Sequence, residues 1–204
     1  MSLPSSRPSA PGLKPPPRID YTTALEHLVH HITLHSPPFG HINTDRVLTT
    51  WRQARVAGDH GVYATVQGLK FAGGADTSKS GSRAYRWPQV IFQRREILYV
   101  LYFTMPRFAN LTYRDKLTTV FHELYHISPE CNGDLRRFSG RNYAHGRSRE
   151  SYNARLQPWI DTYLGCPGAR EAASFLEPNL AELKASYGDV VGRQIRPPKP
   201  VLLR

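Results

Sequence analysis

The segment from Thr112 to Ile127 constrains the fold more than any other part of the sequence. Its apolar residues recur at the three- and four-residue spacing of a single helix face, which predicts an amphipathic helix packed on a core. Thr112 is a suitable N-cap with Asp115 three residues later, and Ser128-Pro129 should end the helix. The apolar stripe consists of Leu117, Val120, Phe121, Leu124 and Ile127.

The same helix carries the pattern His-Glu-x-x-His at residues 122–126. Residues four apart on a helix share a face, so His122 and His126 can bind one divalent cation, and nitrogen ligands suit zinc. Glu123 lies beside the first ligand, where its carboxylate can take the proton of a metal-activated water. Three fixed positions also recur by chance, but here they lie on the best-capped helix and off its apolar stripe. We therefore expect a zinc site with Glu123 as general base.

A catalytic zinc needs a third protein ligand, and four downstream residues are candidates. His145 is preferred, because the stretch 142–146 stands just before the next expected helix and can point back across the loop. Glu150, on that helix, is the second choice. Glu130 and Asp134 are expected to cap or brace the loop, and Asp134 could also hold a ligand histidine in one tautomer.

Other polar residues near the motif have two interpretations. Tyr143 is the preferred donor to an oxyanion, ahead of Tyr125. A group of arginines follows the motif and predicts either a solvated basic loop or a surface for an acidic peptide or nucleic-acid backbone. This group consists of Arg136, Arg137, Arg141, Arg147 and Arg149.

Histidines and cysteines elsewhere in the chain are expected to have no catalytic role. His27, His31 and His35 recur every four residues, with His30 adjacent, and are expected to form a solvated helix face. Cys131 is expected to be a structural or incidental thiol.

The order of the predicted elements indicates an α+β fold. Helices are expected over residues 21–35, 112–127, 148–164 and 169–187, the last interrupted by Pro178. Strands are expected over residues 46–56, 61–71, 85–92 and 96–103. The short connection between the first two strands favours an antiparallel hairpin.

The ends of the chain differ from its body in composition. Residues 1–18 and 193–204 are rich in proline and carry seven of the eleven net positive charges without any acidic residue. We expect a disordered basic tail over 1–18, one folded domain over 19–190 and a second basic tail over 191–204. Such tails favour polyanions without sequence preference. The absence of a long apolar run and of a secretory signal, with only two cysteines, predicts a cytoplasmic protein without membrane contact.

Three stretches of the sequence are similar to a known family. Residues 118–127, followed by 133–138 and by Tyr143-Ala144-His145-Gly146, resemble the phage-type metallopeptidases, which look like relatives of the SprT-like zinc peptidases. The resemblance covers about residues 20–165 and implies a zinc peptidase in which the histidine of the His-Gly context, His145, is the third ligand. Many SprT-like proteins also have a four-cysteine zinc ribbon. The two cysteines of this chain are too few for one.

These observations together predict a compact zincin-like α+β domain with a small antiparallel or mixed sheet. The expected activity is amide hydrolysis of a protein or peptide by zinc-activated water, with His122, His126 and His145 as Zn²⁺ ligands. Glu123 is the expected base, and Tyr143 is expected to stabilise the oxyanion. The alternative is a basic nucleic-acid-associated protein with a structural or idle zinc site, which would contact nucleic acid through its tails and through Arg136, Arg137, Arg141 and Arg147.

Overall fold

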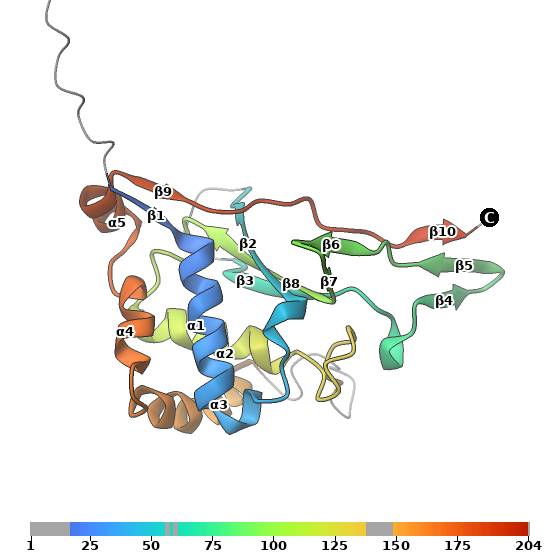
Figure 1. Cartoon of the computed structure of the whole chain (residues 1–204), viewed down its shortest axis with the longest axis horizontal. Helices are drawn as coiled ribbons and strands as arrows, with labels where there is room; N and C mark the ends of the chain where they lie inside the picture. Colours follow the sequence, from blue (N-terminus) through green and yellow to red (C-terminus); the bar gives the residue numbers. More distant parts are fainter. Residues whose placement is uncertain (1–16, 56–57, 59–60, 138–148, 204) are drawn as a thin grey trace, which may run out of the picture.

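A computed structural model describes residues 17–55, 58, 61–137 and 149–203 of the chain. The fold is mixed α+β, with helices gathered on one side of several small sheets (Figure 1). The helices are α1 (Tyr21–His35), α2 (Tyr113–Tyr125), α3 (Arg149–Leu164), α4 (Ala169–Ala173) and α5 (Leu180–Tyr187). The strands are β1 (Arg18–Asp20), β2 (Val47–Gln53), β3 (Ala64–Gly68), β4 (Thr77–Ser80), β5 (Arg83–Arg86), β6 (Val90–Phe92), β7 (Arg95–Ile97), β8 (Tyr99–Met105), β9 (Asp189–Val191) and β10 (Val201–Leu203).

The central sheet has the order β2-β8-β3, with β8 parallel to β2 and antiparallel to β3. The predicted hairpin between the first two strands is therefore wrong. Every residue of β8 is buried, so this strand takes the middle position and separates β2 from β3. Strand β3 is left at the edge of the sheet, next to α2.

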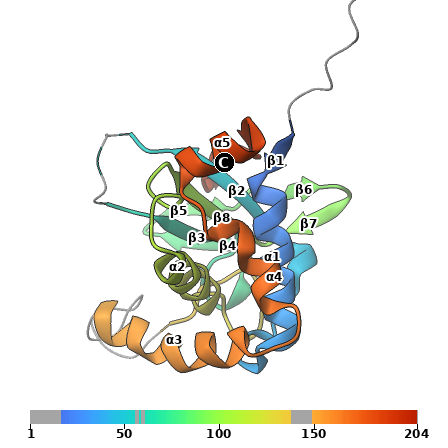
Figure 2. The same cartoon turned by 90° about the vertical axis from the view of Figure 1, so that its left-hand side faces the viewer.

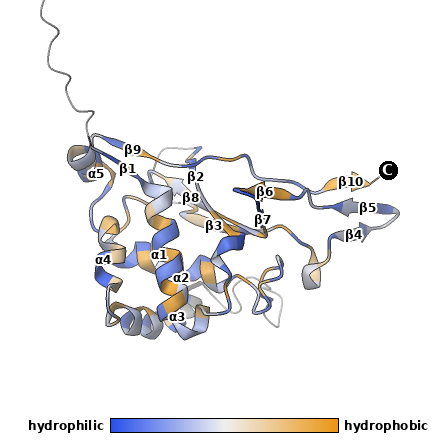
Figure 3. Ribbon diagram, in the orientation of Figure 1, coloured by the Kyte–Doolittle hydropathy of each residue, from blue (hydrophilic) through white to orange (hydrophobic). Residues whose placement is uncertain are grey.

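The two faces of β8 contribute to different apolar clusters. Tyr99, Leu101 and Phe103 pack with α1, α2 and α3 in the main core, whereas Val100 and Tyr102 belong to a smaller cluster on the opposite face. This alternation follows from the two-residue period of a strand. Figure 2 shows α1, α2, α3 and α4 on one side of the central sheet, and Figure 3 shows that hydrophilic and hydrophobic residues alternate along α1.

The predicted helices are confirmed, and so is the predicted N-cap Thr112. The Asp20 carboxylate accepts a hydrogen bond from Thr23 N–H at the start of α1, and Thr112 Oγ1 accepts one from Asp115 N–H at the start of α2. Helix α2 is also held from its side by Lys116. Its buried ammonium donates to the carbonyls of Leu176 and Pro178 at 2.8 Å each, and burial lowers the pKa of Lys116 to about 8.

Two of the predicted strands are each divided in the structure. Residues 85–92 contribute to β5 and to β6, which lie in different sheets, and residues 96–103 are split between β7 and β8. Strands β6 and β7 form a hairpin through Gln93 and Arg94, which both have positive φ. Within the described residues no helix is both long and apolar enough to cross a membrane.

The C-terminal segment is packed on the body, so our expectation of a free tail over 191–204 is wrong for its described part. Trp51 N–H donates to Arg193 O at 2.9 Å, and Gln67 Nε2 donates to Pro198 O at 2.8 Å. Between these contacts, Ile195 packs on the smaller apolar cluster. The segment therefore crosses the face of the sheet that the helices leave open, and it then pairs as β10 with β5.

Substitution of Arg193, with Arg196 as the control, tests this packing. The guanidinium of Arg193 donates to the Glu26 carboxylate and to Thr49 O, and it lies over the Phe92 ring at 4.4 Å, whereas Arg196 is exposed. We expect Arg193→Ala to lower the free energy of unfolding by about 1–2 kcal/mol, or the melting temperature by about 2–8 °C. Arg196→Ala should leave the melting temperature unchanged in thermal unfolding. Equal melting temperatures for both variants would contradict the packed position of this segment.

Candidate functional site

His122 and His126 bring two ring nitrogens together at the C-terminal end of α2. Their Nε2 atoms lie 3.1 Å apart, and the two ring planes are inclined by 70°. His126 is the C-cap residue, but its backbone is still helical (φ −73°, ψ −16°), so the four-residue spacing keeps both side chains on one face. Both residues are buried. The two nitrogens therefore converge on one point below the protein surface.

Asn153 of α3 fixes the orientation of the first imidazole. Its Oδ1 lies 2.8 Å from His122 Nδ1. An amide oxygen only accepts hydrogen bonds, so Nδ1 carries the proton and the lone pair of His122 is on Nε2. A hydrogen bond of this kind to the outer nitrogen is typical of metal-binding histidines.

The contact with Asn153 belongs to a row of polar bonds between α2 and α3. Arg114, Thr118 and His122 recur every four residues on α2 and face the partner helix. The guanidinium of Arg114 donates to Gln157 Oε1 at 2.7 and 2.9 Å, and Gln157 Nε2 donates to Thr118 Oγ1 at 3.2 Å. The row fixes the register between the two helices and so places Asn153 beside His122.

Glu123 links α2 to the edge of the central sheet. Its Oε2 accepts a hydrogen bond of 2.7 Å from Val66 N–H of β3. Leu69 N–H donates to Leu98 O, just before β8, and Thr104 N–H of β8 donates to Tyr63 O. The backbone groups of the odd-numbered residues of β3 therefore face β8, and those of Val66 face outward from the sheet edge. Glu123 is 7% exposed, and this hydrogen bond holds its carboxylate between α2 and β3.

Two cavities lie on either side of the histidine pair along β3. The first, of about 280 Å³, is lined by Tyr63, His122, Glu123 and Asn153, with residues of the first turns of α2. The second, of about 360 Å³, contacts His126 at the other end of β3. Its apolar wall is formed by Phe71, Ala72, Trp87 and Leu135. Among the described residues, the histidine pair thus lies between two cavities at the two ends of β3.

Several predicted site residues lie outside the part of the chain that the structure describes. These are His145 and Tyr143 together with Arg141 and Arg147, and the side chain of Glu150 is also not described. Among the described residues, no group of three or more His, Cys, Asp or Glu side chains is placed to hold a metal ion. The described part of the site therefore contains two imidazoles and one adjacent carboxylate, and the third ligand remains a prediction.

Asp134 braces the loop after α2, as predicted. Its carboxylate accepts hydrogen bonds from the N–H groups of Gly73 and Leu135, and it pairs with Arg137. Burial alone would raise the pKa of Asp134, but these hydrogen bonds lower the pKa overall. Among the described contacts it is Asn153, and not Asp134, that orients a histidine of the motif.

The other predicted residues near the site have structural contacts. Arg136 donates to Tyr125 O at 2.8 Å and its guanidinium lies 4.4 Å from the centre of the Tyr125 ring. Glu130 is exposed. The Cys131 thiol is free and accepts a long contact from Asn43 N–H.

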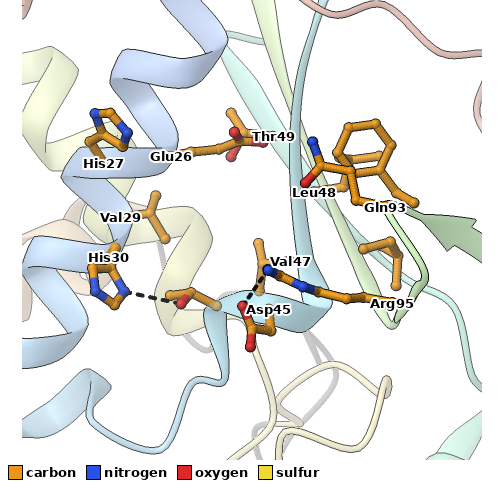
Figure 4. A pocket seen from close by; sticks show the side chains of 13 residues that line it. Glu26, His27, Val29, His30, Asp45, Val47, Leu48, Thr49, Gln93 and Arg95 are labelled. Atoms are coloured by element: carbon orange, nitrogen blue, oxygen red, sulfur yellow. Dashed lines mark hydrogen bonds and ion pairs between the residues drawn. The ribbon is translucent and has the colours of Figure 1, made fainter.

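The histidines of α1 do not converge as a second metal site among the described residues. His31 Nδ1 lies 2.9 Å from Tyr163 OH, and His30 Nδ1 lies 3.2 Å from Thr44 Oγ1. His27 and His30 line a separate cavity of about 250 Å³ between α1, β2 and the β6–β7 hairpin, where Arg95 pairs with Asp45 (Figure 4).

Two contributors to the site were missed by the sequence analysis. The backbone N–H of Val66 has no sequence signal at all. Asn153 does have a weak one, because Asn153 and Gln157 recur four residues apart, as Thr118 and His122 do on the partner helix. Comparison of the two polar spacings could have suggested that these faces meet.

Comparison with known proteins adds no assignment to this geometry. No family model, no curated protein and no solved structure matches the chain.

Proposed function

We propose that this protein is a zincin-like, zinc-dependent hydrolase that cleaves protein or peptide substrates. The observation that carries the proposal is the convergence of His122 Nε2 and His126 Nε2 at 3.1 Å, with the first imidazole oriented by Asn153. Glu123, the next residue in the chain, lines the same cavity as His122. A pair of imidazoles and a non-ligand carboxylate on one helix is the part of a zinc hydrolase site that the His-Glu-x-x-His pattern supplies.

The separation of the two nitrogens fits a shared metal ion. Tetrahedral zinc with nitrogen ligands at about 2.0–2.1 Å requires the two nitrogens to lie about 3.3 Å apart. The observed 3.1 Å is close to this value. Without a cation, the same approach permits a hydrogen bond from His126 Nε2–H to His122 Nε2, so metal content distinguishes a metal site from a structural histidine pair.

In this proposal His122 and His126 hold Zn²⁺, and His145 is the third ligand, with Glu150 as the alternative. When bound, the metal lowers the pKa of a water molecule and polarises the scissile carbonyl. Glu123 then accepts the proton of that water and transfers it to the leaving amine. The hydrogen bond from Val66 N–H keeps the Glu123 carboxylate fixed during this transfer. Tyr143 is the proposed donor to the oxyanion.

An extended polypeptide is the substrate class that best suits the surroundings of the site. Strand β3 is a sheet edge, and the two cavities open at its two ends with the histidine pair between them. Val66 N–H is occupied by Glu123, so a peptide that lies along β3 can pair only with the other outward backbone groups of this strand. The cavity lined by Phe71, Trp87 and Leu135 then suits an apolar side chain of that peptide.

The first prediction from this proposal concerns metal affinity. Wild-type protein should bind about one zinc per chain, and His122→Ala or His126→Ala should lose most of it. Asn153→Ala should weaken zinc binding by about 10–100-fold, because the tautomer of His122 is no longer fixed. His30→Ala is the matched control, since His30 bonds only to Thr44 among the described contacts and should leave zinc binding unchanged. Competitive titration with a chelating dye measures the affinities of wild type and the four variants, and zinc binding unaffected by His122→Ala would exclude the site.

The second prediction separates binding from chemistry. Glu123→Gln retains an oxygen that accepts from Val66 N–H, so the fold and the zinc content should be preserved. An amide does not take a proton at neutral pH, and hydrolysis of labelled casein by zinc-loaded protein should fall by about 10²–10⁴-fold. Circular dichroism and metal analysis of the same preparation serve as controls. Full activity in this variant would remove Glu123 from the role of general base.

A further inference from the structure

The apolar cavity beside His126 is the larger of the two that flank the histidine pair. Its volume is about 360 Å³, within the roughly 300–1,000 Å³ of protein ligand pockets. His126 is itself one of the lining residues, and the apolar walls come from three separate segments of the chain. These walls are Phe71, Ala72, Trp87 and Leu135. A group bound at the histidine pair therefore has an apolar space directly next to it.

Two aromatic rings form part of the wall of this cavity. The ring centroids of Phe71 and Trp87 lie 6.0 Å apart, and the ring planes are inclined by 41°. Trp87 directly follows β5 and packs on the smaller apolar cluster of the central sheet, so its position is supported from behind. Aromatic rings prefer offset and edge-to-face contacts with one another, which contribute beyond the burial of apolar area. The pair therefore favours a third aromatic ring over an aliphatic side chain.

Asp134 joins two of the segments that line the cavity. Its carboxylate accepts hydrogen bonds from Gly73 N–H and from Leu135 N–H, at 2.8 Å each. Arg136 N–H donates to His126 O, which ties the second of these segments to the end of α2. The shape of the cavity is thus fixed by hydrogen bonds before a side chain enters it, and this preorganisation lowers the cost of binding.

The charged side chains that line the cavity are engaged in contacts within the protein. Lys70 pairs with carboxylates outside the cavity, and Arg137 pairs with Asp134. The Arg136 guanidinium donates to Tyr125 O and lies over the Tyr125 ring. An acidic side chain would have to replace these contacts, and burying it beside the apolar walls would be costly. The cavity therefore favours an uncharged side chain.

We propose that this cavity is the specificity subsite of the hydrolase, and that it selects an aromatic side chain next to the peptide bond that is cut. The inference rests on the proposed function, which places the scissile carbonyl at the histidine pair. Consecutive residues of an extended chain are only about 3.3 Å apart, so the side chain that enters beside His126 belongs to a residue close to that carbonyl. Phe71 and Trp87 are the specificity-determining residues in this assignment.

Peptides that differ at a single position test the preference. A quenched fluorogenic peptide with phenylalanine at this position should be cleaved with a kcat/KM about tenfold or more above that of its alanine and glutamate counterparts. Mass spectrometry of the products should place the phenylalanine next to the cut. Equal kcat/KM values for the three peptides, or a preference for glutamate, would overturn the subsite and leave the hydrolase proposal standing.

Substitution of Ala72, with Ala75 as the control, tests the cavity itself. Both alanines are exposed, but Ala72 lines the cavity and Ala75 does not. Ala72→Phe fills part of the cavity and should lower kcat/KM for the phenylalanine peptide by about tenfold or more, with little change for the alanine peptide. Ala75→Phe should leave both values unchanged. Equal losses for the two peptides, or equal losses in the two variants, would show a general effect on the fold and contradict the subsite.

Peptide binding separates failure of this inference from failure of the proposed hydrolase. The anisotropy of labelled phenylalanine and alanine peptides is measured on zinc-loaded Glu123→Gln protein, which should not cut them. Binding of the phenylalanine peptide should be about tenfold tighter, and Ala72→Phe in the same background should remove the difference. This result would support the subsite even if wild-type protein cleaves neither peptide. Equal binding of the two peptides would overturn the subsite, whether or not wild-type protein is a hydrolase.

Discussion

The hydrogen bond between His122 and Asn153 is the interaction on which the candidate site depends. Two histidines at helical spacing share a face, but a free imidazole can rotate and exchange its proton between its two nitrogens. The hydrogen bond to Asn153 fixes both the rotation of the ring and the position of its proton. Asn153 is in place for this bond because the polar row of Arg114, Thr118 and Gln157 fixes the register of α3 against α2. The orientation of the His122 ring thus depends on the packing of α3 against α2.

Helix α2 is held on its other sides by contacts of a different kind. Its apolar stripe packs on the face of the central sheet to which Tyr99 and Phe103 contribute, and Lys116 ties it to the carbonyls of Leu176 and Pro178. Glu123 ties it to β3. A site assembled before substrate or metal arrives needs little reorganisation, which is the condition for effective electrostatic and proton-transfer catalysis. The burial of both histidines and of Glu123 follows from the same packing.

The sequence predicted those elements whose causes are local. Helices α1 and α2 follow from apolar periodicity and from the caps Asp20 and Thr112, and their predicted positions are confirmed. The order of the strands depends on which strand is apolar on both faces, and β8 displaced the expected hairpin for that reason. The C-terminal segment has the composition of a free tail, yet Arg193 and Ile195 find partners far away in the sequence. The His122–Asn153 contact is equally non-local, whereas the motif itself is visible in five consecutive residues.

The central claim is that the two Nε2 atoms converge on a metal ion and not merely on each other. X-ray absorption spectroscopy at the zinc edge, on protein loaded with one equivalent of zinc, tests this most directly. The account predicts a first shell at about 2.0–2.1 Å, with the multiple-scattering signal of at least two imidazoles, and loss of that signal in His122→Ala. A first shell without imidazole, unchanged by His122→Ala, would contradict it.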